Sequence, residues 1–332
     1  MAEKTYDVVG IGNAIVDIIA RCDDGFLTKH DLDKGFMRLI DADEAARLYE
    51  AMGPAIERSG GSVANSIAGA ASFGAKSGFI GRVAADQFGG IFRHDIRSLG
   101  IAYTTEPAQD GAPTARCLVL VTPDGERTMN TFLGTSVDFT PADMDEDMIG
   151  AAKIVYLEGY LFDKDAAKSA FRAAAKLAKA AGAKVALTLS DPFCVDRHRA
   201  DFRKLVKEDA DIVFANEKEI TTLYEVNSFD AAADLALEDC ELAVLTRSEA
   251  GSVIVGAGQT TEVAADPVAK VVDATGAGDL YAAGFLYGLT QGLPVEACGR
   301  LGSLAAAEVI SHIGARPETN LAKLARERGL LE

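Results

Sequence analysis

The chain has 332 residues, of which 48% are hydrophobic and 25% are charged, so it can bury a substantial core. Its formal net charge is −17, and no run of Lys and Arg interrupts this acidic balance. The resulting field repels polyanions, which argues against nucleic acid and anionic membrane surfaces as partners. An anionic small molecule would therefore need a local site made of backbone N–H groups and a few basic side chains.

The five cysteines are odd in number and lack the CxxC or CxxxxC spacing of a zinc site, so we expect reduced and mostly buried thiols. No segment approaches the roughly twenty apolar residues of a membrane span. The N-terminal stretch is too short and too polar at its flanks for a signal peptide. These features predict a cytoplasmic location.

Apolar or β-branched runs alternate with Ala-rich patterns of helical period along most of the chain. The predicted strands are residues 7–11, 77–80, 115–121, 154–157, 185–189, 212–215, 242–245 and 251–255, and the clearest predicted helices are residues 65–73, 165–181 and 229–236. This alternation predicts an α/β domain whose mostly parallel sheet is covered by helices on both faces.

Two segments, residues 21–39 and 101–133, depart from this alternation. The second contains Pro123-Asp124-Gly125 between alternating apolar runs, which predicts a hairpin turn. We interpret the two segments as a small β-rich lid on a larger body. The predicted division assigns residues 1–16, 43–100 and 135–332 to the body, and residues 17–42 and 101–134 to the lid.

A glycine-rich turn opens the predicted helix of residues 280–289, in the sequence Asp273-Ala274-Thr275-Gly276-Ala277-Gly278-Asp279. Such a turn presents free N–H groups and the positive end of the helix dipole, which together favour an anion. Asp279 falls in the first helical turn, where it can accept the proton of a hydroxyl that attacks a phosphorus atom. The helix end should keep the pKa of Asp279 low. From spacing alone, an ordinary loop followed by a charged helix start remains an equal alternative.

This heptapeptide resembles the second signature, D-T-x-G-A-G-D, of the ribokinase-like or phosphofructokinase-B-type carbohydrate and nucleoside kinases, from which Ala274 departs. Further landmarks of that family follow in the expected order, and the resemblance covers essentially the whole chain. They are residues 10–17, residues 59–65, the N-x-x-E motif of Asn216 and Glu219, and residues 246–251. The resemblance implies a ribokinase-like three-layer α/β/α body with a lid, and phosphoryl transfer from ATP with Mg²⁺.

The resemblance also implies roles for individual residues. Asp279 would be the base, and Gly276, Ala277 and Gly278 would hold the phosphoryl group. The implied substrate-binding residues are Asn13, Asp17, Gly61, Ser62, Asn65, Arg127 and Tyr160. The implied nucleotide-binding residues are Asn216, Glu219, Thr246, Gly251, Thr275, Ser303 and Ala307. Glu219 would act on Mg²⁺ through water, and Asp273 and Thr275 fall where some relatives bind a monovalent cation such as K⁺.

Residues 24–30, 125–130 and 190–193 look more like the adenosine kinases than the ribokinases or fructokinases. We therefore expect transfer to the 5′-hydroxyl of a nucleoside, with adenosine first. The alternatives are a sugar kinase acting on a ribose-, fructose- or 2-keto-3-deoxygluconate-like molecule, and a non-catalytic ligand-binding protein. Glu158 stands where adenosine kinases usually carry a small residue, and Met37 where several carry a polar one. Because relatives use the lid as a flap or as a dimer clasp, both monomer and homodimer stay open.

Two other kinds of nucleotide site are disfavoured by the sequence. The chain contains no G-x-x-x-x-G-K-[ST], which excludes a P-loop, and Gly10-x-Gly12 lacks the third glycine of a dinucleotide fingerprint. Hydride transfer is therefore an unlikely class of reaction for this chain. The four histidines show no metal-ligand spacing either.

Overall fold

The computed structural model describes residues 4–256 and 258–332, and it contains two sheets. The larger, eight-stranded sheet has the order β13-β12-β11-β10-β9-β8-β1-β5. Its strands are β1 Tyr6–Ile11, β5 Ser77–Ile80, β8 Ala152–Glu158, β9 Lys184–Thr188, β10 Ile212–Asn216, β11 Leu242–Thr246, β12 Ser252–Gly256 and β13 Gln259–Val263. Neighbours from β5 to β11 pair in parallel, whereas β12 and β13 are antiparallel. Buried apolar runs form these strands because both faces of the sheet are covered.

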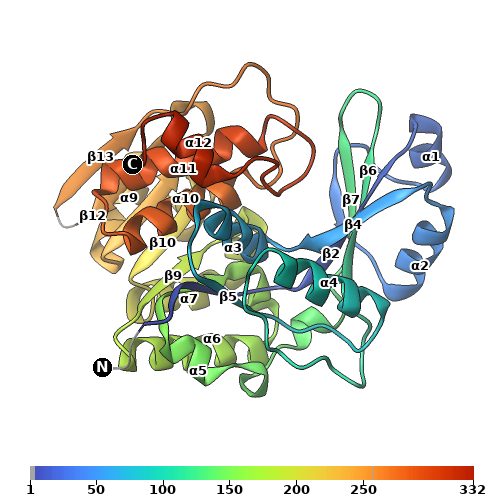
Figure 1. Ribbon diagram of the computed structural model, residues 1–332, viewed down its shortest axis with the longest axis horizontal. Coiled ribbons are helices and arrows are strands. Elements are labelled where there is room, and N and C mark those ends of the chain that lie inside the picture. The colour runs from blue at the N-terminus through green and yellow to red at the C-terminus, as the bar shows by residue number, and fades with distance from the viewer. Residues whose placement is uncertain (1–3, 257) are drawn as a thin grey trace.

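Helices cover the two faces of this sheet (Figure 1). On one face lie α5 Glu146–Gly150, α6 Asp165–Ala180, α7 Pro192–Glu208, α8 Glu217–Tyr224 and α9 Phe229–Asp239. On the other lie α3 Ser62–Phe73, α10 Ala277–Thr290 and α11 Val295–Val309, with α12 Leu321–Glu327 packed against α3 and α11. The helix α4 Gln87–Ser98 packs mainly against the smaller sheet, and its Phe92 contacts Phe79 of the edge strand β5. The predicted α/β class, with a mostly parallel sheet and helices on both faces, is confirmed.

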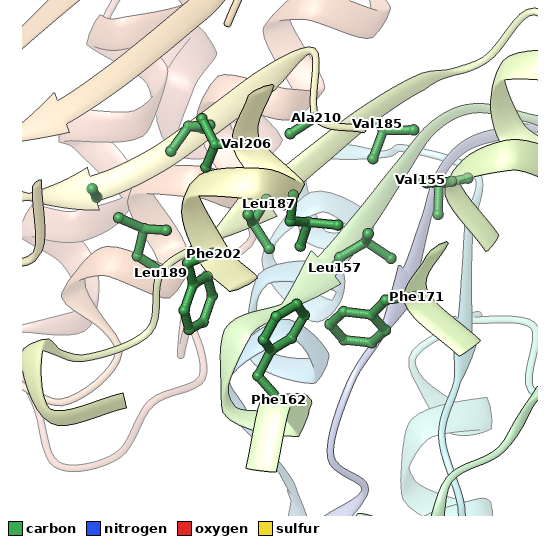
Figure 2. Packing of buried hydrophobic residues seen from close by; sticks show 14 of the residues in the cluster. Val155, Leu157, Phe162, Phe171, Val185, Leu187, Leu189, Phe202, Val206 and Ala210 are labelled. Carbon is green, nitrogen blue, oxygen red and sulfur yellow. The ribbon is translucent and has the colours of Figure 1, made fainter. Parts of the chain in front are cut away.

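The first face is packed by aromatic side chains from the helices against aliphatic side chains from the strands. Phe171 of α6 and Phe202 of α7 lie next to Phe162, over Leu157 and Leu187 of the sheet (Figure 2). Full burial of each such side chain contributes about 1.5–3 kcal/mol. This core fixes the carboxyl ends of β8, β9 and β10, from which several of the predicted site residues follow.

The smaller sheet has five strands in the order β3-β7-β6-β2-β4, and it lies beside the larger sheet (Figure 1). Its strands are β2 Ile15–Arg21, β3 Met37–Leu39, β4 Ala55–Gly60, β6 Ala115–Val121 and β7 Arg127–Phe132, and α1 Asp24–Lys29 and α2 Ala42–Ala51 connect the first of them. The predicted hairpin is present, since β6 and β7 are antiparallel on either side of residues 122–126.

Strand β4 differs from the predicted division of the chain. Its residues 55–60 were assigned to the body, yet β4 pairs antiparallel with β2 in the smaller sheet. The reason is local: the sequence Ala-Ile-Glu-Arg-Ser-Gly has no apolar alternation, and the backbone hydrogen bonds of a sheet edge decide its place. Residues 101–102 also differ, because Ala102 bridges to Gly78 of β5 in the larger sheet.

Short 3₁₀ helices complete the chain. They are Gly134–Asp138, Pro141–Asp143, Gly159–Asp163 and Ser248–Ala250. Within the described residues, no helix has both the length and the apolar character needed to cross a membrane.

Candidate active site

The glycine-rich turn of residues 273–279 leads into α10. Gly276 is the N-cap residue, with a φ of +80° that glycine adopts without strain, and no side chain caps the helix. A Cβ atom built on Gly278 would meet no atom within 4 Å, so open space adjoins the turn. Uncapped amide groups beside open space fit the phosphoryl oxygens of a nucleotide.

Asp279 in the first turn of α10 is held by two side chains of α3. Ser62 Oγ donates to Asp279 Oδ1 at 2.7 Å, and Asn65 Nδ2 donates to Asp279 Oδ2 at 3.0 Å. The two helices approach closely because α3 carries Gly69. A Cβ atom on this glycine would lie 2.5 Å from Leu280 Cδ1. The structure thus brings the predicted base together with two predicted substrate-binding residues.

The expectation of a low pKa for Asp279 was wrong. Burial raises its pKa to about 6, although the hydrogen bonds from Ser62 and Asn65 and the charge of Arg316 act in the opposite direction. Loss of solvation therefore outweighs the contacts that stabilise the ionised form. A carboxylate with this pKa is a better proton acceptor near neutral pH than an ordinary aspartate.

Asp17, Asn13 and Gly61 adjoin this centre. Burial raises the pKa of Asp17 to about 6, the charge of Asp279 adds to this, and three arginines oppose it. Asp17 packs against Gly60, where a Cβ atom would lie 2.3 Å from its Oδ2. Gly61 has a φ of +102°, and a Cβ atom there would lie 2.2 Å from the carbonyl oxygen of Asn13. Only glycine lets the two chain segments pass so closely.

Glu158 at the end of β8 fixes the amide of Asn13. Its side-chain oxygen Oε1 accepts from Asn13 Nδ2 at 2.8 Å, and Oε2 accepts from the backbone N–H of Val63 at 2.9 Å. Asn13 Oδ1 accepts from Ser136 Oγ at 2.8 Å, so both ends of this amide are used. Glu158 is only 1% exposed, and burial raises its pKa to about 7.

Arg127 contacts the segment of the glycine-rich turn. It forms an ion pair with Asp273, and the two side chains are only 9% and 3% exposed. The same carboxylate accepts from the backbone N–H groups of Thr275 at 3.0 Å and Gly314 at 2.8 Å. The side chain of Asp273 is thus fully engaged, which leaves backbone carbonyl groups of residues 273 and 275 for the predicted monovalent cation.

Tyr160 lies beside the loop that carries Ser190. Its hydroxyl donates to the carbonyl oxygen of Ser190 at 3.2 Å, and its backbone N–H donates to Ser190 Oγ at 3.2 Å. Burial raises the pKa of Tyr160 well above its usual range. The tyrosine therefore stays neutral, and its hydroxyl is held by the backbone.

The N-x-x-E motif forms the start of α8. Asn216 Oδ1 accepts from the backbone N–H of Glu219 at 2.9 Å, and the Glu219 carboxylate accepts from the backbone N–H of Asn216 at 2.9 Å. Thr246 lies next to Asn216 across the β10–β11 pair. Burial raises the pKa of Glu219 to about 7.

Glu219 is the residue that the sequence predicts to act on Mg²⁺ through water. Among residues 4–256 and 258–332, no three His, Cys, Asp or Glu side chains form a metal cluster. Mg²⁺ keeps several water ligands and needs few protein ligands. Both carboxylate oxygens of Glu219 accept from Asn216, Oε2 from the backbone N–H at 2.9 Å and Oε1 from Nδ2 at 2.6 Å, so contact of Glu219 with Mg²⁺ through water stays a prediction.

A cavity of about 400 Å³ lies between α11 and the segment after β13, and Ser303 lines it. Ser303 Oγ accepts from the backbone N–H of Asp266 at 2.7 Å and donates to the carbonyl oxygen of Ala264 at 3.2 Å. Ala307 follows one turn later on α11. Gly251, with a φ of +85°, would place a Cβ atom 2.1 Å from the carbonyl oxygen of Val263. The cavity has the size of a small-molecule site.

The match to a known family decides the class of this site. The family described as pfkB family carbohydrate kinase matches residues 53–321. The chain belongs to the pfkB family. The predicted kinase resemblance is thereby confirmed, and the protein is a phosphotransferase that uses an alcohol group as acceptor. Kinases of this family generally use ATP and Mg²⁺.

Three similar proteins illustrate the range of acceptors in this family. The chain is 52% identical to the adenosine kinase from Sinorhizobium meliloti, with a TM-score of 0.90 and coverage of 98% of this chain and 99% of that one. It is 49% identical to a probable sugar kinase from Rhizobium etli CFN 42, with a TM-score of 0.92 and coverage of 99% and 100%. A 5-dehydro-2-deoxygluconokinase from Bacillus licheniformis is 27% identical over 319 residues, which are 93% of this chain and 91% of that protein.

Sequence reasoning assigned no role to two buried residues at the pfkB site. Glu158 appeared only as a departure from the adenosine kinases, although a carboxylate at the end of a buried strand is itself a signal. Arg316 lies in the segment after α11, where no sequence pattern pointed to it. Its contact partner Ser59 is 257 positions away, so only the fold brings the two residues together.

Proposed function

We propose that this pfkB-family kinase transfers the γ-phosphoryl group of Mg·ATP to the 5′-hydroxyl of adenosine. The observation that carries the proposal is the position of Asp279, which lies at the uncapped start of α10 and is held by Ser62 and Asn65 of α3. The similarity to the Sinorhizobium meliloti adenosine kinase supports adenosine as the acceptor.

In the proposed reaction, Asp17 and Asn65 bind hydroxyl groups of the acceptor, and the attacking hydroxyl gives its proton to Asp279. The amide groups that open α10 stabilise the charge of the phosphoryl group in transit. Mg·ATP, when bound, supplies the phosphoryl group and neutralises its charge. Glu219 would hold the ion through water, while Ser303, Ala307, Thr246 and Gly251 would line the nucleotide site.

A sugar kinase is the second candidate. Both the Rhizobium etli and Bacillus licheniformis relatives are described as acting on sugars or sugar acids. The two candidates share the same phosphoryl-transfer centre and differ only in the acceptor.

Purified protein with Mg·ATP and a panel of acceptors separates these candidates. The panel contains adenosine, guanosine, inosine, ribose, fructose and 2-keto-3-deoxygluconate, and ADP release is measured for each. We expect adenosine to give a kcat/KM at least tenfold above every other acceptor. Consumption of ATP with free sugars alone would replace the nucleoside proposal by the sugar one. If none of the six compounds supported ADP release, the protein would be a ligand-binding protein or would act on an acceptor class outside the panel.

We also propose that the enzyme acts in the cytoplasm, in purine salvage, as a monomer or homodimer. A further proposal is that backbone carbonyl groups of residues 273 and 275 bind K⁺. Support for K⁺ lies in the ordering of this segment by Arg127 and Gly314. Replacing KCl by NaCl at constant ionic strength should lower kcat severalfold. Equal rates in the two salts would remove K⁺ from the cofactors.

A further inference from the structure

Arg316, near Asp17 and Asp279, has two side-chain nitrogens without a hydrogen-bond partner. It follows α11 and is only 7% exposed. Its Nη2 atom donates to the carbonyl oxygen of Ser59 at 2.9 Å and to Ser59 Oγ at 3.0 Å. Ser59 is itself anchored, because its N–H and Oγ both donate to Asp95 Oδ2, at 2.7 and 2.5 Å. Arg316 is thus held firmly, but through one of its three nitrogens.

The other two nitrogens of Arg316, Nε and Nη1, are buried and have no hydrogen-bond partner. Burial lowers the pKa of Arg316 to about 10, so the side chain remains a cation near neutral pH. Leaving donors of a buried cation unpaired is costly, and native proteins rarely tolerate it without a functional reason. We therefore expect Nε and Nη1 to donate to an acceptor atom of a bound ligand.

The surroundings of Arg316 place that ligand at the phosphoryl-transfer centre. Its charge acts on both Asp17 and Asp279. The preceding residue, Ala315, packs on the glycine-rich turn, where a Cβ atom on Gly276 would lie 2.8 Å from Ala315 Cβ. The residues that follow its partner Ser59 along the chain reach both carboxylates. Gly60 lies against Asp17, and Ser62 donates to Asp279.

The chemistry of the group identifies the kind of ligand. A guanidinium presents a planar fork of donors that matches two oxygens of a phosphate or carboxylate, and charge-assisted bonds of this kind are the strong ones. The charges of Asp95, Asp17 and Asp279 act on this cation, but its Nε and Nη1 have no acceptor, and a neutral sugar or nucleoside would bring no negative charge to them. Arg127 and Arg58 also act on Asp17. Arg127 is paired with Asp273 and has one buried nitrogen without a partner, Nε, whereas Arg316 has two, Nε and Nη1.

We propose, on the basis of the function above, that Arg316 donates from Nε and Nη1 to oxygens of the phosphoryl group during transfer and in the phosphorylated product. A bond forms between the acceptor oxygen and phosphorus while the bond from phosphorus to the leaving ADP oxygen breaks. The hydroxyl proton goes to Asp279, and Arg316 keeps its own protons. Arg316 is then a catalytic residue that sits between the acceptor and the start of α10.

Variants at this position test the proposal. Arg316→Gln should lower kcat at least 100-fold and weaken AMP binding at least tenfold, while adenosine binding measured by calorimetry changes less than threefold. Arg316→Lys keeps the charge without the fork and should give intermediate losses. Arg326→Gln, an exposed arginine on α12, is the matched control and should behave as the wild type.

A purely structural role for Arg316, as a tie between β4 and the body, would give a different pattern. Adenosine and AMP binding would then weaken together, with a lower melting temperature, and this result would overturn the proposal. Arg316→Lys provides the same comparison if the glutamine variant does not fold. Inorganic pyrophosphate gives a test that needs no acceptor. If pyrophosphate binds at least tenfold more weakly to the Arg316→Gln variant than to the wild type, the proposed role of Arg316 is supported, even where adenosine proves to be the wrong acceptor. Equal binding of pyrophosphate by the two proteins refutes that role.

Discussion

At Asp279 two opposing effects act on one carboxylate. Burial raises its pKa, whereas Ser62 and Asn65 stabilise the ionised form by donating to it. The helix start and these hydrogen bonds favour the ionised form, whereas burial favours the protonated form. The result, a pKa of about 6, leaves the carboxylate ionised at neutral pH yet able to accept a proton late in the transfer.

Replacement of Asp279 by asparagine removes the proton acceptor and leaves the shape of the site almost unchanged. We expect kcat to fall by a factor on the order of 10³, while the dissociation constant for adenosine changes less than threefold. Coupled ADP release gives the rate, and calorimetry gives the affinity. Asp234→Asn, an exposed residue of α9, should change neither quantity. Unchanged turnover in the Asp279 variant would exclude Asp279 as the base.

The pH dependence of the wild type should report two carboxylates and not one. Asp17 and Asp279 both have a pKa of about 6, and the charge of the ionised Asp279 raises the pKa of Asp17. Because both must lose a proton to bind and activate a hydroxyl, kcat/KM should be level above about pH 7 and fall below about pH 6. Its logarithm should approach a slope of two on the acid side. A slope of one in the wild type would show that a single carboxylate controls the reaction.

A variant that lacks one of the two carboxylates shows which groups produce the slope of two. Asp17→Asn removes one of the two titrating groups, so its residual activity should show an acid-side slope of one. The measurement uses saturating Mg·ATP at constant ionic strength, so that kcat/KM for the acceptor reports the titration of the enzyme–Mg·ATP complex and of the free acceptor. An unchanged slope of two in this variant would assign the second group to another residue, with Glu158 as the first to examine.

The start of α3 depends on a glycine for its geometry. Gly61 and Gly74, at the two ends of this helix, have φ values of +102° and +101°. A Cβ atom on Gly61 would lie 2.2 Å from the carbonyl oxygen of Asn13, whereas one on Gly74 would meet nothing within 4 Å. The two glycines thus share a positive φ but differ in ψ, which is 143° at Gly61 and 11° at Gly74, and in the contact.

Alanine at each of these positions compares a left-handed backbone in open space, at Gly74, with a strained backbone that also meets Asn13, at Gly61. Gly74→Ala should lower the free energy of unfolding by about 1–2 kcal/mol, the cost of the left-handed conformation. Gly61→Ala should lower it by a further ~1–3 kcal/mol and also reduce kcat, because Asn13 must move. Urea unfolding and the kinase assay measure both effects. Equal stability losses in the two variants would show that the Asn13 contact yields at little cost.

Local elements were more predictable from the sequence than contacts between distant ones. The turn at Asp273–Asp279 and the helix after it are contiguous, so their chemistry could be inferred from residue order. The contact of Glu158 with Asn13 spans 145 positions, and that of Arg316 with Ser59 spans 257. No local pattern encodes such pairs. The pKa of Asp279 was missed for the same reason, since its burial arises from α3, over 200 positions earlier.

At the scale of the whole molecule, a buried ion pair joins the smaller sheet to the segment that carries the glycine-rich turn. Arg127 begins β7 of the smaller sheet, and Asp273 precedes the glycine-rich turn of the larger unit. If the smaller sheet acts as the predicted lid, this pair ties the closed position to the order of the phosphate-binding turn. Closure of such a lid excludes water from the phosphoryl group.

Arg127→Met should therefore loosen the lid and admit water. We expect faster amide hydrogen exchange in residues 115–132 and at least a threefold rise in ATP hydrolysis without acceptor, because the buried charge of Asp273 loses its partner. Lys34→Met is the matched control. Lys34 pairs with Asp124 at 2.6 Å inside the smaller sheet region, so its loss should speed exchange near the hairpin without raising hydrolysis. If both variants hydrolyse ATP at the wild-type rate, the Arg127–Asp273 pair does not control closure, and exclusion of water must arise from the acceptor itself.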